Sequence, residues 1–353
     1  MNFGKDGQPL NVLFVNDTRP EKHLGCELVV RNISDVIFES GFVAIQYVSQ
    51  RDFCRLGSFS GLLDGVGLIV INGEGTLHGD RAIGYKIMQF VALGACKQIP
   101  VVLLNATLEN NSKDFYNSFS GFSEIVVRES ASLQELDEVD VPKRVIADAT
   151  FFTPLELIGG IESKNISPKS VYVDDSVLPA VSLDLAVLRS KIKAKSATLF
   201  FSKNKFFWIL SFFKRFPRSL VRNPLLMVRF LLLLPRQVFC SKKSFEEFCL
   251  YISGAELVIT GRFHMVCILL LLEIPFLAVE SNTKKISSLL KDVGIKGRVF
   301  CTVADLEKHY HECDNHNFTA EEYLSIARFK QRAHVGRAKL IDMLCSYSGR
   351  QVG

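Results

Sequence analysis

Arg262 and His264 are the residues of this sequence whose types and spacing most clearly indicate chemistry. They stand two positions apart in the stretch "VITGRFHMV", directly after an apolar run, and the stretch that follows, "MVCILLLL", is apolar all round. The start of a helix offers free amide groups and a partial positive charge. An Arg adds bidentate contacts to carboxylate or phosphate. We therefore predict that Arg262 and His264 bind a small anion, with a surface Arg and a structural His as the alternative.

A pair of lysines, Lys284 and Lys285, follows the next expected strand in the stretch "ESNTKKI". Asn282 and Thr283 are predicted to cap the helix that begins here, which places both lysines in its first turn. Cations at this place oppose the helix dipole, which makes sense if an anion binds between them. The alternative is a simple cap beside a solvated pair of lysines.

Candidates for acid–base chemistry lie in the glycine-rich loop "INGEGTLHGD". Close approach of the backbone to a ligand requires glycines such as Gly73, Gly75 and Gly79. The loop matches neither the GxGxxG pattern nor a phosphate-binding loop, so nucleotide binding is only weakly indicated. Glu74 is the first candidate for a general acid or base and His78 the second. The alternative is a glycine-rich turn in which the Glu and the His are incidental.

Three further polar residues lie near the ends of expected strands. His23 lies at the first strand–helix junction, in "VNDTRPEKHLGCE", and Arg128 follows an apolar strand in "VVRES". For Arg128, a structural salt bridge is an equal alternative to ligand binding. Asp148, in "IADATF", is predicted to be structural, at the crossover between two domains.

The elements that position these residues alternate between apolar strands and helices. The strands lack polar alternation, which is typical of parallel sheets covered on both faces. We predict an α/β fold of two doubly wound, Rossmann-like domains that face each other across a cleft, over residues 1–165 and 166–330, with a C-terminal helix and tail over 331–353. Ligands in such folds bind beyond the carboxyl ends of the strands. Strands are expected near 11–16, 43–49, 67–73, 99–107, 124–130, 143–151, 169–173, 197–201, 255–260, 275–281 and 298–301, and helices near 28–42, 82–97, 130–136, 248–254, 262–273, 283–294 and 321–345.

Length and composition restrict the class of protein. The chain has 353 residues, of which 48% are apolar, enough for two domains with sizeable cores. Its nine cysteines are scattered singly without a CxxC pair, which argues against a disulfide framework or a zinc site and favours a reducing cytoplasm. The first residues do not resemble a signal peptide. No run of about 18 apolar residues is present, so we expect no membrane span.

One segment, over about residues 198–245, is strongly basic and apolar together. Between Leu185 and Phe245 the chain carries fourteen Lys and Arg and no acidic residue. Aromatic residues and Leu interleave with these cations, and prolines break the segment into pieces too short to span a bilayer. We predict that it lies on an anionic membrane surface. Nucleic-acid binding is the competing interpretation, and packing on its own domain is the third.

Several of these stretches resemble the polysaccharide pyruvyl transferase family. The resemblance rests on "LIVINGEGTLHGD", "VVRESAS", "VIADATFF" and "LVITGRFHMVCILLLLEIPFLAVESNTKKISSLLKDVGI", and extends from about Asn11 to Gly294. It implies a fold similar to the two-domain GT-B glycosyltransferases, with phosphoenolpyruvate as the donor. The family's RxH motif corresponds to Arg262–His264, and its Ser-Asn-Thr stretch to Ser281–Thr283. Where the family often carries a His next, this chain has Lys284, which departs from the family's pattern but retains a cation.

The resemblance implies an enzyme that transfers pyruvate from phosphoenolpyruvate onto two hydroxyls of a sugar, in a capsule, an exopolysaccharide or a lipid-linked precursor. The first domain would serve the acceptor and the second the donor. We assign the proton donor to His264 or Glu74 and the base to Glu74 or His78, and expect neither a metal nor a cofactor. The enzyme would be cytoplasmic and attached to the inner face of the cell membrane, without nucleic acid as a partner. The predicted substrate-binding residues are Arg262, Phe263, Ser281, Asn282, Thr283, Lys284, Arg128, Gly73, Gly75, Thr76 and His23.

Two other functions fit the sequence. One is a GT-B-type glycosyltransferase that uses a nucleotide sugar in the synthesis of a surface glycan. The other is a non-catalytic scaffold that binds a glycan or a membrane. Binding of a nucleotide would favour the first of these, and unchanged glycan processing after the loss of Arg262 and His264 would favour the second.

Overall fold

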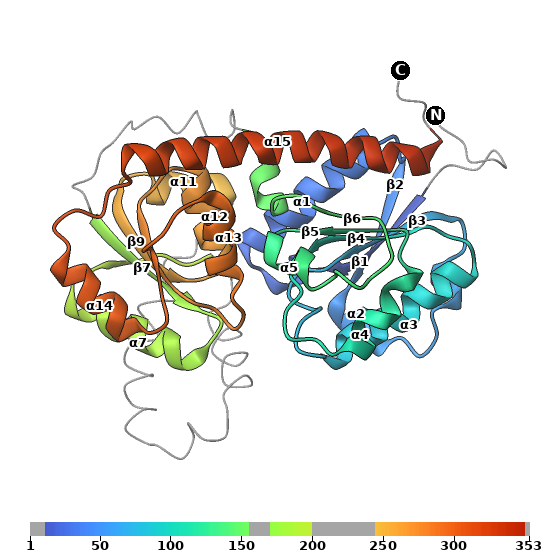
Figure 1. Cartoon of the computed structure of the whole chain (residues 1–353), viewed down its shortest axis with the longest axis horizontal. Helices are drawn as coiled ribbons and strands as arrows, with labels where there is room; N and C mark the ends of the chain where they lie inside the picture. Colours follow the sequence, from blue (N-terminus) through green and yellow to red (C-terminus); the bar gives the residue numbers. More distant parts are fainter. Residues whose placement is uncertain (1–10, 155–169, 200–243, 350–353) are drawn as a thin grey trace, which may run out of the picture. The chain divides into compact units, whose positions relative to one another are not determined.

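Two compact α/β units make up the computed structural model, which describes residues 11–154, 170–199 and 244–349 (Figure 1). The first unit holds the described residues up to Glu21, Cys26–Thr153 and the described residues from Arg328 on. The second unit holds Lys22–Gly25 and the described residues of 154–327. Each unit contains one sheet in which all the paired strands are parallel.

The sheet of the first unit has six strands in the order β2-β1-β3-β4-β5-β6. Its inner strands are continuous apolar runs whose side chains are buried on both faces, as expected for a parallel sheet between helices. The strands are β1 (Asn11–Asp17), β2 (Ala44–Ser49), β3 (Val66–Asn72), β4 (Val101–Ala106), β5 (Glu124–Val127) and β6 (Lys143–Val145).

Helices cover both faces of this sheet, because successive side chains of each strand point to opposite sides. On one face Leu13 shares a core cluster with Phe90 of α3. On the other, Phe14 shares a cluster with Ile33 of α1 and Leu344 of α15. The helices with residues in this unit are α1 (Leu24–Glu39), α2 (Gln50–Arg55), α3 (Ala82–Cys96), α4 (Lys113–Asn117), α5 (Ser130–Gln134) and α15 (Ala320–Ser348), together with the 3-10 turns η1 (Arg19–Glu21), η2 (Ser60–Leu62), η3 (Ser118–Gly121) and η4 (Ala149–Phe152).

The sheet of the second unit has five strands in the order β11-β10-β9-β7-β8. Ile259 of β9 shares a core cluster with Leu185 of α7 and Leu306 of α14. All nine residues of α12 are buried, which explains why its sequence is apolar all round. The elements are β7 (Ser170–Ser176), α7 (Pro179–Lys191), β8 (Lys195–Ser196), α11 (Phe245–Ile252), β9 (Ala255–Gly261), α12 (Phe263–Leu271), β10 (Phe276–Val279), α13 (Lys285–Val293), β11 (Val299–Phe300) and α14 (Val303–Glu312).

Several boundaries differ from those expected from the sequence. The helix expected from residue 28 begins at Leu24, because Leu24 and Cys26 are buried and continue its buried side. The strand expected over 197–201 is the short β8, which ends at Ser196. The pattern indicated neither α7 nor α14. Gly261 ends β9, and a side chain there would collide with Ser176 of β7.

Two predictions concern residues outside the described ranges. The domain boundary near 165 lies in the gap at 155–169, and nearly all of the basic segment lies in the gap at 200–243. Within the ranges that are described, no helix combines the length and apolar character needed to cross a bilayer.

Candidate functional site

Each sheet has one point where the order of its strands reverses. In the first unit, the chain passes from β1 to β2 on one side of β1 and then to β3 on its other side. In the second unit, it passes from β7 to β8 on one side of β7 and then to β9 on its other side. Ligands of open α/β sheets bind beyond the carboxyl ends of the strands at such a point. Glu74 follows β3 and Arg262 follows β9, so both predicted residues stand at a reversal point.

In the first unit, Glu74 lies at the centre of a buried hydrogen-bond network. Asn16, at the end of β1, donates to the carbonyl oxygens of Asn72 at 2.7 Å and of Glu74 at 3.2 Å. The Glu74 carboxylate accepts from the Thr18 hydroxyl at 3.2 Å and from the Cys26 thiol at 3.1 Å. Glu74 is 9% exposed. The network fixes the carboxylate and leaves it in the role of an acceptor.

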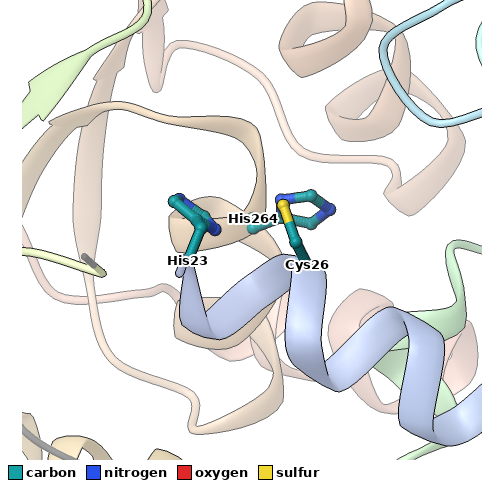
Figure 2. A group of neighbouring side chains, drawn as sticks. All are labelled: His23, Cys26 and His264. Carbon is teal, nitrogen blue, oxygen red and sulfur yellow. The ribbon is translucent and has the colours of Figure 1, made fainter. Parts of the chain in front are cut away.

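Cys26 and Thr18 are parts of this network that the sequence analysis did not single out. Figure 2 shows Cys26 at the beginning of α1, one turn after His23. Burial and the nearby Glu74 carboxylate raise the pKa of the Cys26 thiol well above its ordinary value, so the thiol stays protonated and donates to Glu74. The only sequence signal was the position of Cys26 after the first strand, where single cysteines usually have a packing role.

The other predicted residues of the glycine-rich loop have different surroundings. The His78 ring lies 3.4 Å from the Arg81 guanidinium, and the His78 backbone pairs with Glu109. Gly73 is needed for packing, because a side chain there would collide with Ala106 of β4. Gly75 has a φ of +68°, which a glycine adopts without strain. Thr76 is buried, at 1% exposure.

Arg128 forms a buried ion pair in the first unit. Its guanidinium donates to Asp148 at 2.9 Å and to the Thr107 hydroxyl at 2.7 Å, and it lies 3.4 Å from Glu129. Burial alone would lower the pKa of Arg128, but Asp148 and Glu129 outweigh that effect and raise it, so the guanidinium stays charged. Asp148 also caps η4 through Thr150. Arg128 and Asp148 are thus partners in one buried ion pair.

In the second unit, Arg262 is paired with a carboxylate that the sequence analysis did not consider. Its Nε and Nη2 atoms donate to the two oxygens of Asp175 at 2.6 and 2.7 Å, and both side chains are 13% exposed. Asp175 lies in β7, on the other side of the reversal point, 87 residues away in the chain. Arg262 itself precedes α12 as its N-cap residue. The guanidinium is therefore held in a fixed plane before any ligand binds.

A second carboxyl group, Asp174, lies beside this pair. It is 1% exposed and accepts from the Thr260 hydroxyl at 3.1 Å. Burial and the neighbouring Asp175 raise the pKa of Asp174 well above its ordinary value. The signal that could have indicated both residues is the pair "DD" at the end of an apolar run.

His264, in the first turn of α12, packs closely against the start of α1 (Figure 2). A side chain at Gly25 would collide with Cβ and Cγ of His264, so this position must be a glycine. The rings of His264 and His23 are 5.6 Å apart, and both residues are buried. Burial lowers the pKa of His23 well below its ordinary value, and the positive charges of His264, Arg262 and Lys285 add to the effect. The structure thus gathers four groups that can carry positive charge.

The stretch after β10 is arranged differently from the prediction. Glu280, and not Asn282 or Thr283, caps α13: its carboxylate accepts from the amides of Ile286 at 3.2 Å and Ser287 at 3.1 Å. The sequence pattern did not indicate this cap, because the capping side chain lies several residues before the helix. A carboxylate therefore already occupies the helix start at which an external anion was expected.

Of the predicted residues around this cap, Ser281, Asn282 and Lys284 lie near the surface. Lys284 is the exposed N-cap residue, and Lys285 donates to Asn282 at 3.2 Å. The Ser281 hydroxyl bonds to Asn282 at 3.1 Å, whereas Thr283 is buried. Phe263 is buried and packs edge-on against His264.

Solved structures with the same arrangement of elements share the GT-B fold. The UDP-GlcNAc 2-epimerase of Neisseria meningitidis, solved with UDP-GlcNAc, is 12% identical, with a TM-score of 0.55 over 96% of this chain and 100% of that chain. A putative UDP-N-acetylglucosamine 2-epimerase of Listeria monocytogenes is 11% identical, with a TM-score of 0.53 over 94% of each chain. The predicted fold class, α/β with two doubly wound sheets of GT-B type, is confirmed.

The sequence itself identifies the family within this fold. Residues 44–283 match the family described as polysaccharide pyruvyl transferase, and this match covers about two thirds of the chain. The chain belongs to the polysaccharide pyruvyl transferase family. The match includes the Gly73–Gly79 loop and Arg262–His264, and it ends at Thr283, just before the departure at Lys284. A comparison with curated proteins found no match.

Proposed function

We propose that this protein transfers pyruvate from phosphoenolpyruvate onto two hydroxyls of a sugar, forming a pyruvate ketal on a surface polysaccharide or its lipid-linked precursor. Membership of the pyruvyl transferase family supports the reaction class. The observation that carries the choice of donor is the proximity of His264, Arg262 and Lys285 to His23: Arg262 follows β9 at the reversal point of the second sheet, and the rings of His23 and His264 are 5.6 Å apart. Phosphoenolpyruvate carries a carboxylate and a phosphate, and a group of cations in one place is what such a donor requires.

The contacts of these four groups suggest a role for each in binding phosphoenolpyruvate. Arg262 is held in plane by Asp175, which orients its guanidinium for a planar anion such as a carboxylate. His23 is neutral at pH 7 because of its lowered pKa, so it can accept or donate a hydrogen bond without adding charge. His264 and Lys285 supply the positive charge that would stabilise the phosphate as it leaves.

The chemistry requires one proton donor and one base. A proton adds to the methylene carbon of phosphoenolpyruvate, and the first sugar hydroxyl adds to the central carbon and loses its proton. Phosphate then leaves, and the second hydroxyl adds to the same carbon and loses its proton, so that inorganic phosphate and the ketal are the products. We assign the donor to His264 or Glu74 and the base to Glu74 or His78. The acceptor contacts of Glu74 with Thr18 and Cys26 favour it as the base.

The acceptor in this proposal is a lipid-linked or polymeric glycan at the inner face of the membrane. The basic segment over residues 198–245 would attach the enzyme to anionic lipid, and its composition is the support for that role. Sedimentation with vesicles is the test. Binding to vesicles that contain an anionic lipid and not to neutral vesicles is expected, whereas equal binding to both, or none, would contradict the attachment.

The reaction is tested by the release of inorganic phosphate from phosphoenolpyruvate in the presence of extracted glycan, with mass spectrometry of the glycan. Phosphate release and the mass increment of a pyruvate ketal are expected for the natural chain and for the control variant Arg51→Ala, which changes an exposed Arg of the first unit. Both signals should be lost in Arg262→Ala and His264→Ala. Unchanged activity of these two variants would overturn the proposal.

A glycosyltransferase reaction is the second candidate, because GT-B relatives include a protein solved with UDP-GlcNAc. Ligand binding distinguishes the glycosyltransferase reaction from pyruvyl transfer. Thermal stabilisation by UDP or CMP, without stabilisation by phosphoenolpyruvate, would favour a nucleotide-sugar donor over the proposed one.

A further inference from the structure

A group of metal-ligating side chains lies at the end of α14, in the second unit. His309, Cys313 and His316 bring one potential ligand atom each to within 4.8 Å of one another. All three are partly exposed. The absence of a CxxC pair from the sequence argued against a zinc site. A site with a single Cys and two His does not need such a pair, and the spacing here is His-x3-Cys-x2-His.

The backbone fixes the positions of these three residues. His309 and Cys313 are four residues apart at the end of a helix, a spacing that places them on one face, and the Cys313 amide donates to the His309 carbonyl at 3.0 Å. His316 follows in a turn held by Arg298, whose guanidinium donates to the carbonyl oxygens of His316 at 3.0 Å and of Asn317 at 2.9 Å. The fold therefore already orders the three ligands, which lowers the entropy lost when a metal binds.

The contacts around His316 match those of a metal-binding histidine. Nε2 of His316 lies 3.3 Å from the carbonyl oxygen of Tyr310, and the two rings stack at 5.3 Å. The ring of His309 packs on Phe300 at 5.0 Å. When one imidazole nitrogen donates to a carbonyl, the other carries the lone pair that binds a metal.

We propose that His309, Cys313 and His316 form a zinc-binding site that fastens the end of α14 to the turn before α15. Two imidazoles and a thiolate are a ligand set suited to Zn²⁺ and not to Mg²⁺ or Ca²⁺. Bond lengths of about 2.0–2.3 Å in a tetrahedral site imply ligand atoms about 3.3–3.8 Å apart, which small side-chain rotations would reach from the observed spacing. The Cys313 thiol, which donates to the Asn315 carbonyl at 3.2 Å, would release its proton to solvent, and water would complete the coordination.

The test uses the full chain without an affinity tag, stripped with a chelator and then titrated with Zn²⁺ or Co²⁺. The natural chain should bind zinc at this site, and Co²⁺ should give the thiolate charge-transfer absorption of a Cys ligand. Cys313→Ser should lose that absorption, and both Cys313→Ser and His316→Gln should bind zinc at least about tenfold more weakly. The matched controls are Cys301→Ser and His311→Gln, which alter exposed residues of the same region outside the cluster and should bind as the natural chain does.

Two outcomes would overturn the zinc site. One is the absence of zinc uptake by the natural chain, and the other is unchanged uptake by Cys313→Ser and His316→Gln. His264→Gln tests whether zinc binds near His264 and His23 instead. Loss of zinc binding in that variant alone would place the ion there and not at the end of α14. Thermal melts of the metal-free variants show whether they fold. Because metal content and absorption are the readouts, the result does not depend on pyruvyl transfer.

Discussion

The reversal points of the two sheets are equivalent places in the topology, but they carry opposite chemistry. In the first unit, the centre is the carboxylate of Glu74, surrounded by the donors Thr18 and Cys26. In the second unit, Arg262 stands there, paired with Asp175 and near three other groups that can be positive. Topology decides where a ligand can bind, and the residues at the strand ends decide which ligand.

The two arginines that follow strands sharpen this comparison. The Arg128 side chain is 2% exposed and satisfied by Asp148, Glu129 and Thr107, whereas the Arg262 side chain is 13% exposed and paired with Asp175. We therefore expect the first to contribute to the stability of its unit and the second to the proposed site. The following predictions test that division, beginning with the largest effect.

Arg128→Met should lower the free energy of unfolding by about 3–5 kcal/mol, because Asp148 and Glu129 would remain buried without their partner. Urea denaturation measures the change. Asp148→Asn, which removes a negative charge from the same cluster, is the variant to use if the first does not fold, and it too should be less stable than the natural chain. A loss below about 1 kcal/mol in Arg128→Met would assign Arg128 to a ligand and not to the fold.

Gly25→Ala should lower the free energy of unfolding by about 1–3 kcal/mol, because the new Cβ would collide with the His264 side chain. Gly57→Ala is the matched control, since nothing lies within 4 Å of a Cβ placed there. Equal stability of the two variants in urea would show that His264 does not pack against the start of α1. That result would contradict the close packing of His264 against Gly25, on which the comparison depends.

The lowered pKa of His23 predicts a pH dependence of stability. Below its ordinary pKa of 6.5 the unfolded chain binds a proton that the folded chain resists, so stability falls as the pH decreases from 6.5 to the depressed value. One such group contributes a slope of up to about 1.4 kcal/mol per pH unit. His23→Gln should flatten the curve below pH 6.5 relative to the natural chain. Parallel curves for the two proteins would mean that His23 is not held in its neutral form.

The sequence was sufficient for the fold class and for the places where polar residues follow strands. Continuous apolar strands between helices predicted the parallel sheets, and Glu74 and Arg262 were expected at strand ends. What it could not show were pairings between distant residues. Asp175 lies 87 residues from Arg262, and Gly25 is needed only because α12 brings His264 against it. The cap at α13 was misplaced because Glu280 reaches over several residues to the helix amides.

The most direct test of the strand-end cations of the second unit is calorimetric titration of the protein with phosphoenolpyruvate alone. The natural chain and Arg51→Ala should bind it with equal affinity, and Arg262→Ala should weaken binding by about 10–100-fold, the loss expected for a charge-assisted bidentate contact. Binding of equal strength in Arg262→Ala, or no binding to the natural chain, would contradict the account.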